Sequence, residues 1–256
     1  MRLFPITAPP PGTGPSPRRP TAAMLRRIQQ HLDHGGGAVG HVVPLDTRDD
    51  ALESVGGKGR SLARMANSGV RVPGGFVVKI SAYRAFVAEN GLREELLALA
   101  TGDVVDGMLS FEGPARRIHE VFAAAAVSPA VAAEITAAYG ELDGALPVAV
   151  RSSANAEDLP GLSFAGQHSS YLNVRGAAEI VAAVKDCWAS LWTAQAMAYR
   201  HQNAVDHASV AMAVVAQLMV PSDVSGILFT ANPATGDRSE IIINASYGLG
   251  EAIVSG

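Results

Sequence analysis

The sequence predicts an α+β fold, in which helices are gathered before and between strands that follow one another along the chain. Segments with helical apolar periodicity recur between residues 60 and 203. Three apolar, strand-like runs then fill the last quarter of the chain, and typical turn sequences separate them. The turns are Pro221-Ser222-Asp223 and the longer segment from Asn232 to Asp237. A doubly wound sheet would alternate strands and helices throughout, so we expect the α+β arrangement.

The composition is that of a globular protein with one large domain or two lobes. Hydrophobic residues make up 48% of the 256 residues and charged residues 17%, below the roughly 25% charged residues of an average soluble domain. The net charge of −4 argues against a nucleic-acid-binding surface and against a basic membrane-binding surface. The first residues lack the apolar core of a secretory signal, and no apolar stretch reaches membrane-spanning length. We therefore expect a cytoplasmic protein that binds neither nucleic acid nor membranes.

The single cysteine, Cys187, excludes an intramolecular disulfide and a multi-cysteine metal site. Its flanks, from Lys185 to Trp192, have the pattern of a packed helix. A catalytic thiol needs an activating neighbour, and none is evident here. We expect Cys187 to be an inert thiol in the core.

The chain divides into an arm, residues 1–40, and a regular domain, residues 41–256. The arm is rich in proline and glycine, which predicts disorder, with one short helix from Thr21 to His34. Its segment Gly35 to Gly40 satisfies the dinucleotide-binding pattern GxGxxG. That pattern requires a strand before it and a helix after it, and neither is predicted there, so we interpret the segment as a linker.

The first half of the domain shows alternating strand and helix patterns, and glycines mark the expected ends of the helices. An extended segment, His41 to Pro44, comes first. A glycine-rich turn leads into a helix from Arg60 to Ala66, in which Leu62 and Met65 share one face and Ser68-Gly69 ends the helix. The next expected elements are a strand from Val72 to Val78, then a helix with Ser81 as N-cap, Tyr83, Phe86 and Val87 as its buried stripe, and Gly91 as its end.

The second half contains three longer helical segments and the three final strands. Ser128 is expected to cap the helix that begins at Pro129, and Gly140 is expected to end it. The expected helices are residues 114–126, 129–139 and 178–203, and the expected strands are residues 208–220, 226–230 and 240–244.

A polar run, Val150 to Gln167, follows the strand-like segment Leu146 to Val150 and is the strongest functional signal in the chain. Chemistry often lies on the loop at the end of a strand, because the strand fixes the backbone. Arg151 there can offer a rigid fork of donors to phosphate oxygens, and the glycines allow backbone N–H groups to approach an anion. The alternative is a structural ion pair between Arg151 and Glu157 or Asp158, which usually contributes about 0–1 kcal/mol.

Lys58 lies between glycines at the expected entry to a helix, where the free N–H groups favour an anion. The segment does not match the P-loop pattern, because Leu52 occupies the position of the first glycine and Gly59 follows the lysine. Two interpretations stay open for Lys58: a phosphate ligand, or a solvated lysine in a glycine-rich turn.

The remaining polar candidates carry weaker signals. Glu157 and Asp158 could bind Mg²⁺, although capping of the following turn is the favoured interpretation. His201 and His207 flank a helix end without a third ligand, which argues against zinc. His168 adjoins the polar run and is left without a role. Gln217 is either an ordinary polar residue of an edge strand or a group that faces adenine.

Several of these segments together resemble the nucleotide-binding domain of the phosphoenolpyruvate synthase (pyruvate, water dikinase) and rifampicin phosphotransferase family. The resemblance runs from about Val42 to the last residue. The segments that carry it are Val55 to Gly59, Val150 to Gln167, Cys187 to Trp192 with Ala198 to Arg200, Ser225 to Pro233, and Tyr247 to Glu251.

The resemblance implies an ATP-grasp-like domain whose two lobes close over ATP and Mg²⁺. It implies that Lys58 from one lobe and Arg151 from the other contact the phosphates, with Arg151 as the catalytic residue. Gly166 and Ser170 would belong to the loop over the phosphates, and Gln217 would lie beside adenine. The family often has threonine in place of Ser170, and both residues supply a hydroxyl.

The family further implies a partner for this chain. In longer relatives, ATP phosphorylates a histidine on a separate domain, which carries the phosphoryl group to pyruvate or to an antibiotic hydroxyl. No phosphohistidine motif of the Thr-Ser-His-Ala type is present, and the family's later acidic metal-binding residue would come after Gly256, so we expect a C-terminally incomplete domain. The expected function is the ATP-binding portion of a dikinase-type phosphotransferase. The alternatives are a degenerate, non-catalytic nucleotide- or partner-binding module and a fragment of a rifamycin phosphotransferase.

Overall fold

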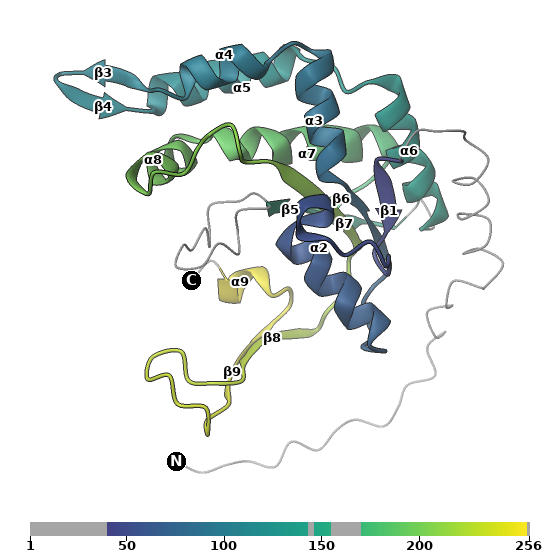
Figure 1. Cartoon of the computed structure of the whole chain (residues 1–256). Helices are drawn as coiled ribbons and strands as arrows, with labels where there is room; N and C mark the ends of the chain where they lie inside the picture. Colours follow the sequence, from purple (N-terminus) through teal and green to yellow (C-terminus); the bar gives the residue numbers. More distant parts are fainter. Residues whose placement is uncertain (1–39, 143–145, 155–169, 255–256) are drawn as a thin grey trace, which may run out of the picture. The chain divides into compact units, whose positions relative to one another are not determined.

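The structure is a computed structural model that describes residues 40–142, 146–154 and 170–254. The arm, the short helix predicted from Thr21 to His34 and the GxGxxG-like segment lie outside the described residues. Figure 1 shows the described part as helices and strands. In chain order the elements are β1 (Val42–Pro44), α2 (Leu52–Asn67), β2 (Gly75–Val78), α3 (Ile80–Glu89), α4 (Arg93–Leu99), β3 (Asp103–Val105), β4 (Met108–Ser110), α5 (Glu112–Ala124), α6 (Pro129–Glu141), β5 (Val148–Ala154), β6 (Ser170–Val174), α7 (Ala177–Ala189), the 3-10 turn η1 (Ser190–Trp192), α8 (Ala194–Gln202), β7 (Met212–Leu218), β8 (Val224–Phe229), β9 (Ile242–Tyr247) and α9 (Glu251–Val254).

A five-stranded antiparallel sheet with the order β1-β2-β7-β5-β6 organises the domain. Helix α2 packs on one face of this sheet, and α3 and α7 pack on the other (Figure 1). The central strand β7 is therefore covered on both sides, and its residues from Met212 to Ala216 are all completely buried. The mixture of helices and antiparallel strands confirms the α+β prediction.

Aromatic side chains fill the layer between the sheet and the outer helices. Phe86 of α3 packs against Phe122 of α5, with ring centres 5.4 Å apart, and against Trp188 of α7 at 5.2 Å. Tyr83 meets Trp188 edge to face. These contacts hold α3, α5 and α7 together on the covered side of the sheet.

Several predicted boundaries were wrong. Helix α2 begins at Leu52, so the glycine-rich turn is part of a helical segment, and Met65 is 41% exposed. Helix α3 begins at Ile80 with Lys79 as N-cap, so Ser81 lies inside it. Helix α6 continues through Gly140 to Glu141; it begins at Pro129 with Ser128 as N-cap, as predicted, although the Ser128 side chain accepts no capping hydrogen bond.

Two larger errors concern the second half of the chain. The single helix expected from 178 to 203 is divided by η1 into α7 and α8. The strand expected to end at Val150 continues to Ala154, so Arg151 lies within β5 and not on the connection after it. The helix α4, the small β3–β4 hairpin, the strand β6 and the short α9 were not predicted.

The β8–β9 hairpin forms a separate two-stranded sheet. Its register places Val224 opposite Tyr247 and Leu228 opposite Ile243, with Gly226 opposite Ala245 between these pairs. Because directly opposed residues share a face, this face is apolar from end to end. Its four large side chains are 57%, 88%, 57% and 64% exposed in the order named.

No single described helix is long and apolar enough to cross a membrane, and α5 with α6, which reach that length only together, meet at an angle of 82°.

Candidate functional site

Three neighbouring strands place three of the predicted site residues on one face of the main sheet. Arg151 of β5 lies directly opposite Ser170 of β6 and opposite Val215 of β7. Gln217 of β7 lies opposite Ala149, two residues before Arg151 on β5. Opposed residues and residues two positions apart share a face, so Arg151, Ser170 and Gln217 all belong to the same side.

Helix α2 packs on that same side and is fastened to β5 by Ser153. The Ser153 hydroxyl accepts a hydrogen bond from the Gly59 N–H at 3.1 Å and donates one to the Val55 carbonyl at 2.9 Å. Ser153 is two residues after Arg151 on the same strand, so both side chains lie on the side that α2 covers. The glycine-rich segment is therefore held against the strand that carries Arg151.

Gly56 makes this close approach possible. Its φ of 69° and ψ of 176° interrupt the helical backbone of α2. This φ is in the region that favours glycine, and a Cβ there would collide with the carbonyl oxygen of Ser153. The interruption gives the second part of α2 its own N-terminal turn, and the Ser153 hydroxyl satisfies one of the N–H groups of that turn.

Lys58 lies in this N-terminal turn, two residues after the interruption, and is half-buried. It was expected to approach the phosphates from a different lobe than Arg151. The structure instead places Lys58 and Arg151 in one packed unit, because α2 is in direct contact with β5. The N-terminal position agrees with the sequence prediction, although the helix as a whole begins earlier.

Gln217 is held in a defined orientation at the other end of the same face. Its side chain is 9% exposed, and its amide nitrogen donates to the Pro73 carbonyl at 3.3 Å. Strand β7 lies between β2 and β5, so the alternative of an ordinary edge-strand residue was wrong. Next to it on β2, Gly75 leaves no space for a side chain, since a Cβ there would meet the Ala216 carbonyl oxygen and Leu45.

The remaining candidates in and beside the predicted polar run lie outside the described residues. These are Glu157, Asp158, Gly166 and His168. Ser170, which was expected in the loop over the phosphates, is instead the first residue of strand β6. The rest of that loop and the alternative ion pair of Arg151 are not tested.

Cys187 is completely buried in α7, as predicted for an inert core thiol. Burial raises the pKa of its thiol well above the ordinary value, and the neighbouring Asp186 charge acts in the same direction. The thiol therefore stays protonated at neutral pH and is a poor nucleophile.

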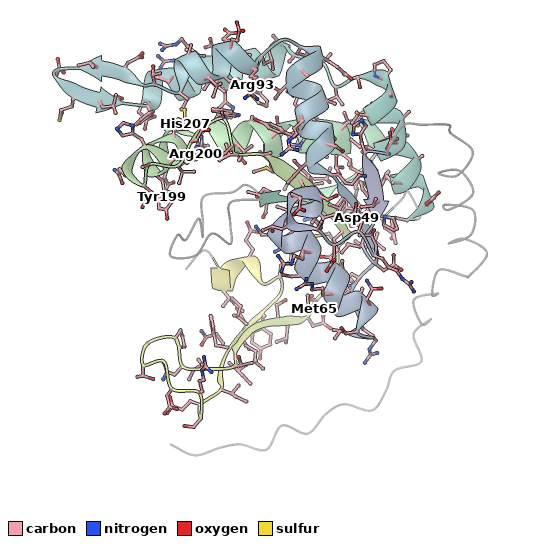
Figure 2. The ribbon with its side chains drawn as sticks, viewed as in Figure 1. Asp49, Met65, Arg93, Tyr199, Arg200 and His207 are labelled. Atoms are coloured by element: carbon pink, nitrogen blue, oxygen red, sulfur yellow. The ribbon has the colours of Figure 1, made fainter. Side chains whose placement is uncertain are left out.

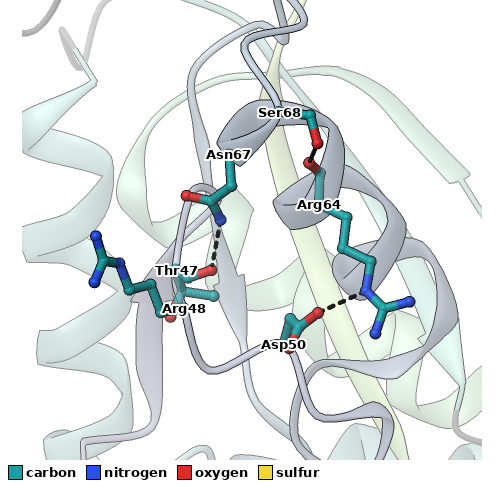
Figure 3. Close-up of a pocket in the computed structure, with 6 residues that line it drawn as sticks. All are labelled: Thr47, Arg48, Asp50, Arg64, Asn67 and Ser68. Carbon is teal, nitrogen blue, oxygen red and sulfur yellow. Dashed lines mark hydrogen bonds and ion pairs between the residues drawn. The ribbon is translucent and has the colours of Figure 1, made fainter.

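A surface hollow of about 620 Å³ contains none of the predicted site residues (Figure 3). It is lined by residues of α2 and of the segment before α2. Among them, Arg64 and Asp50 form an ion pair in which Arg64 Nε lies 2.7 Å from Asp50 Oδ2. Arg64 holds the pKa of the Asp50 carboxyl below its ordinary value. Asn67 donates to the Thr47 carbonyl across the same hollow. Since these polar groups bind one another, the hollow has the features of a surface crease rather than a binding site.

The sequence analysis missed Ser153 and a buried polar cluster around Arg200. Ser153 carried only one weak signal, its place two residues after Arg151 in what proved to be one strand. The cluster joins Arg200 and His207 near the end of α8 to Trp192 and Tyr83. His207 was considered only as a zinc ligand, and the described residues contain no group of three or more histidine, cysteine, aspartate or glutamate side chains placed to hold a metal ion.

Comparison with known proteins adds independent information. Residues 52–256 match the family described as pyruvate phosphate dikinase, AMP/ATP-binding domain. A rifampicin phosphotransferase from a Streptomyces species is 46% identical over 217 residues, which cover 84% of this chain and 25% of that protein.

Two archaeal proteins show similar agreement. A probable phosphoenolpyruvate synthase of Pyrococcus horikoshii is 42% identical over 248 residues, covering 82% of this chain and 30% of that protein. A phosphoenolpyruvate synthase of Aeropyrum pernix is 44% identical over 213 residues, covering 81% and 26%. The chain thus spans about a quarter to a third of the length of these relatives.

Proposed function

Because this chain belongs to the pyruvate phosphate dikinase AMP/ATP-binding domain family, we propose that it binds ATP as the nucleotide-binding portion of a dikinase-type phosphotransferase. The observation that carries the proposal is the single sheet face that holds Arg151, Ser170 and Gln217 under the glycine-rich turn of α2. Arg151 and Ser170 suit the phosphates of one nucleotide, and Gln217 suits its base.

The phosphates are assigned to the end of the face nearest α2. There Arg151 would donate from its planar guanidinium to two phosphate oxygens, and Lys58 would supply a second positive charge from its N-terminal turn. The Ser170 hydroxyl, opposite Arg151, would donate to a further oxygen. Phosphoryl transfer depends mainly on positioning and on neutralisation of charge, so these donors would supply most of what this chain contributes to the reaction.

The adenine is assigned to the other end of the face. Gln217 lies two residues further along the strands and is already oriented by Pro73. Its side-chain oxygen would accept from the exocyclic amine of the base. This assignment separates the base from the phosphates by two residues along a strand, about 7 Å.

No described side chain is assigned to Mg²⁺. The described residues contain no group of three potential ligands, and Mg²⁺ in nucleotide sites is held largely by phosphate oxygens and water with only one or two carboxylates. The proposed roles of Arg151 and Lys58 do not depend on it.

The proposal extends to two features of the longer relatives. A second lobe would close over the nucleotide, and the exposed apolar face of the β8–β9 hairpin supports this, since such faces usually have a partner. The phosphoryl group would pass to a histidine on a further domain or subunit. Residues outside this chain would determine the final acceptor, pyruvate or an antibiotic. The relatives include a protein named phosphoenolpyruvate synthase and one named rifampicin phosphotransferase.

The test is the equilibrium affinity for Mg-ATP of the purified chain and of two variants, Arg151→Ala and Lys58→Ala. One charge-assisted hydrogen bond contributes about 1.5–3 kcal/mol, so we expect each variant to bind roughly 10- to 100-fold more weakly. Mg-ATP should also raise the melting temperature of the unmodified chain, because it binds only the folded state.

The matched control is Arg116→Ala, which removes an exposed arginine of α5. Its affinity should equal that of the unmodified chain. Unchanged affinity in both Arg151→Ala and Lys58→Ala would refute the assigned phosphate roles, and a chain whose melting temperature ignores Mg-ATP would instead be the degenerate module.

A further inference from the structure

A second pocket, of about 230 Å³, lies between α3, α4 and the segment that leads into β7. Its walls include Arg84 of α3, Arg93 of α4, Trp192 of η1 and His207. The residues from 208 to 211 complete it. None of the residues assigned to the nucleotide lines this pocket.

Behind this pocket lies a buried cation with no acidic partner among the described residues. The Arg200 side chain is 1% exposed. Its Nε donates to His207 Nδ1 at 2.9 Å, its guanidinium lies 5.4 Å from the centre of the Trp192 ring, and its Nη2 has no hydrogen-bond partner in the described part of the chain. Burial lowers its pKa to about 10, so it is still charged at neutral pH. Buried charges are normally paired, and the absence of a carboxylate here is unusual.

Arg200 also determines which proton His207 carries. A guanidinium can only donate, so His207 Nδ1 must accept, and the neutral ring then keeps its proton on Nε2. Burial, followed by the charge of Arg200, lowers the pKa of His207 to about 4, which keeps this form dominant at neutral pH. The pocket wall therefore contains a neutral imidazole whose second nitrogen is a hydrogen-bond donor.

The charges that line the pocket all have one sign. Arg84 and Arg93 are exposed at its rim and make no ion pair with any described residue. The lining contains no aspartate or glutamate. Figure 2 labels Arg93, His207 and Arg200, of which Arg93 and His207 both line the pocket. Two guanidinium groups and a neutral imidazole thus line a space without a counter-charge, and a third guanidinium, that of Arg200, is buried behind the imidazole.

We propose that this pocket binds a small organic anion, a carboxylate on a flat apolar body. The carboxylate would lie at the rim and pair with Arg84 and Arg93, which line the pocket, while the buried charge of Arg200 behind His207 would add to the positive field. The apolar body would lie against Trp192 and the aliphatic side chains Val87, Leu96 and Val210. The volume is below the roughly 300–1,000 Å³ of pockets for larger ligands, which limits the body to about one ring.

The site is distinct from the proposed nucleotide site, and the inference does not rest on nucleotide binding. Ala211 immediately precedes β7, whereas Gln217 lies near its far end. Six residues of extended strand separate them by about 20 Å. Occupation of one site can therefore be measured without occupation of the other.

The test is a titration of the whole chain with benzoate, followed by the backbone amide NMR signals of residues 208–211, without nucleotide. We expect saturable shifts that are confined to the pocket. Benzamide, which has the same shape without the charge, should bind at least about tenfold more weakly. Inorganic phosphate, which has charge without an apolar body, should also bind at least about tenfold more weakly.

The double variant Arg84→Gln and Arg93→Gln should bind benzoate at least about tenfold more weakly. Its backbone amide NMR signals outside the pocket should match those of the unmodified chain, which shows an intact fold. The matched control is Arg71→Gln, an exposed arginine before β2 that is not part of the pocket, and it should bind benzoate like the unmodified chain. Benzoate shifts that do not saturate would overturn the proposal, as would equal binding of benzamide or unchanged affinity in the double variant. Phosphate binding as tight as that of benzoate would overturn the requirement for an apolar body.

Discussion

The five-stranded sheet and the β8–β9 hairpin are built from similar apolar strands but differ in what covers them. In β7 the residues from Met212 to Ala216 are completely buried between helices on both faces. In the hairpin, one whole face is exposed, and Tyr247 is 88% accessible. Burial of one large apolar side chain stabilises a fold by about 1.5–3 kcal/mol, and an exposed side chain contributes little of this. Apolar sequence alone therefore does not show where stability resides.

The largest difference in the free energy of unfolding should come from replacing a phenylalanine by alanine in each of the two regions. Phe86→Ala removes a ring that is 2% exposed and contacts Phe122 and Trp188, so we expect a loss of about 3–5 kcal/mol in the free energy of unfolding. Phe229→Ala in the hairpin, where the ring is 40% exposed, should cost less than about 1 kcal/mol. Urea denaturation measures both, and equal losses would mean that the Phe229 ring, which lies on the opposite face of the hairpin from Leu228 and Tyr247, is packed as tightly as Phe86.

The junction between α2 and the sheet should also be sensitive. Gly56→Ala combines an unfavourable φ with a collision against the Ser153 carbonyl, and we expect a loss of more than about 2 kcal/mol.

The control for backbone strain alone is Gly69→Ala. Gly69 also has a positive φ, 84°, but no atom lies within 4 Å of the position that a Cβ would take. It should cost about 1 kcal/mol. If the two variants unfold at the same urea concentration, the close packing of α2 on β5 is not what makes Gly56 necessary.

A smaller effect is expected for the hydroxyl that joins α2 to β5. Ser153→Ala leaves the Gly59 N–H and the Val55 carbonyl without their buried partner, which should cost about 1–3 kcal/mol. Ser225→Ala in the hairpin removes a hydrogen bond to the Gly248 carbonyl in a half-buried position and should cost about 0.5–1.5 kcal/mol. Denaturation of both variants under identical conditions ranks them, and the reverse order would contradict the comparison.

The mildest effect is a pH dependence that belongs to the covered region. The pKa of His207 is lowered from 6.5 to about 4 in the folded chain, so the unfolded chain binds more protons between these values. The contribution of His207 to stability is complete above about pH 6.5 and is lost as the pH falls toward 4. His207→Gln should make the free energy of unfolding less dependent on pH in this window, as followed by thermal denaturation. His119→Gln, on the exposed side of α5, is the control and should keep the original dependence.

The fold class and most helices could be predicted because they depend on local periodicity and composition. The errors arise where distant residues decide. Glycine has a low helix propensity, so residues 56–59 were expected to form a turn, but the Ser153 hydroxyl, 94 residues away from Gly59 in sequence, satisfies that part of α2. The break between α7 and α8 has a local cause instead, because the Ser190 hydroxyl donates to the Cys187 carbonyl three residues earlier and η1 replaces the regular helix.

The candidate site was predictable as a set of residue types but not as an arrangement. Sequence pattern identified Arg151, Ser170 and Gln217, yet only the strand order and register put them on one face. The end of β5 was predicted too early because Arg151, Ser152 and Ser153 are polar. From sequence alone, a polar residue on a strand is interpreted as facing solvent, since the helix that covers it is not known. The Arg200 cluster could not be predicted, since an arginine near the end of a helix usually lies in solvent.

The chain has only two tryptophans, and the structure buries both at one junction, Trp188 at the end of α7 and Trp192 in η1. Tryptophan fluorescence, excited at a wavelength that tyrosine does not absorb, is therefore a local signal that reports the helical layer and not the β8–β9 hairpin. Circular dichroism averages over the whole backbone. A difference between the two transition midpoints would reveal a region that unfolds on its own before the layer around the indoles gives way.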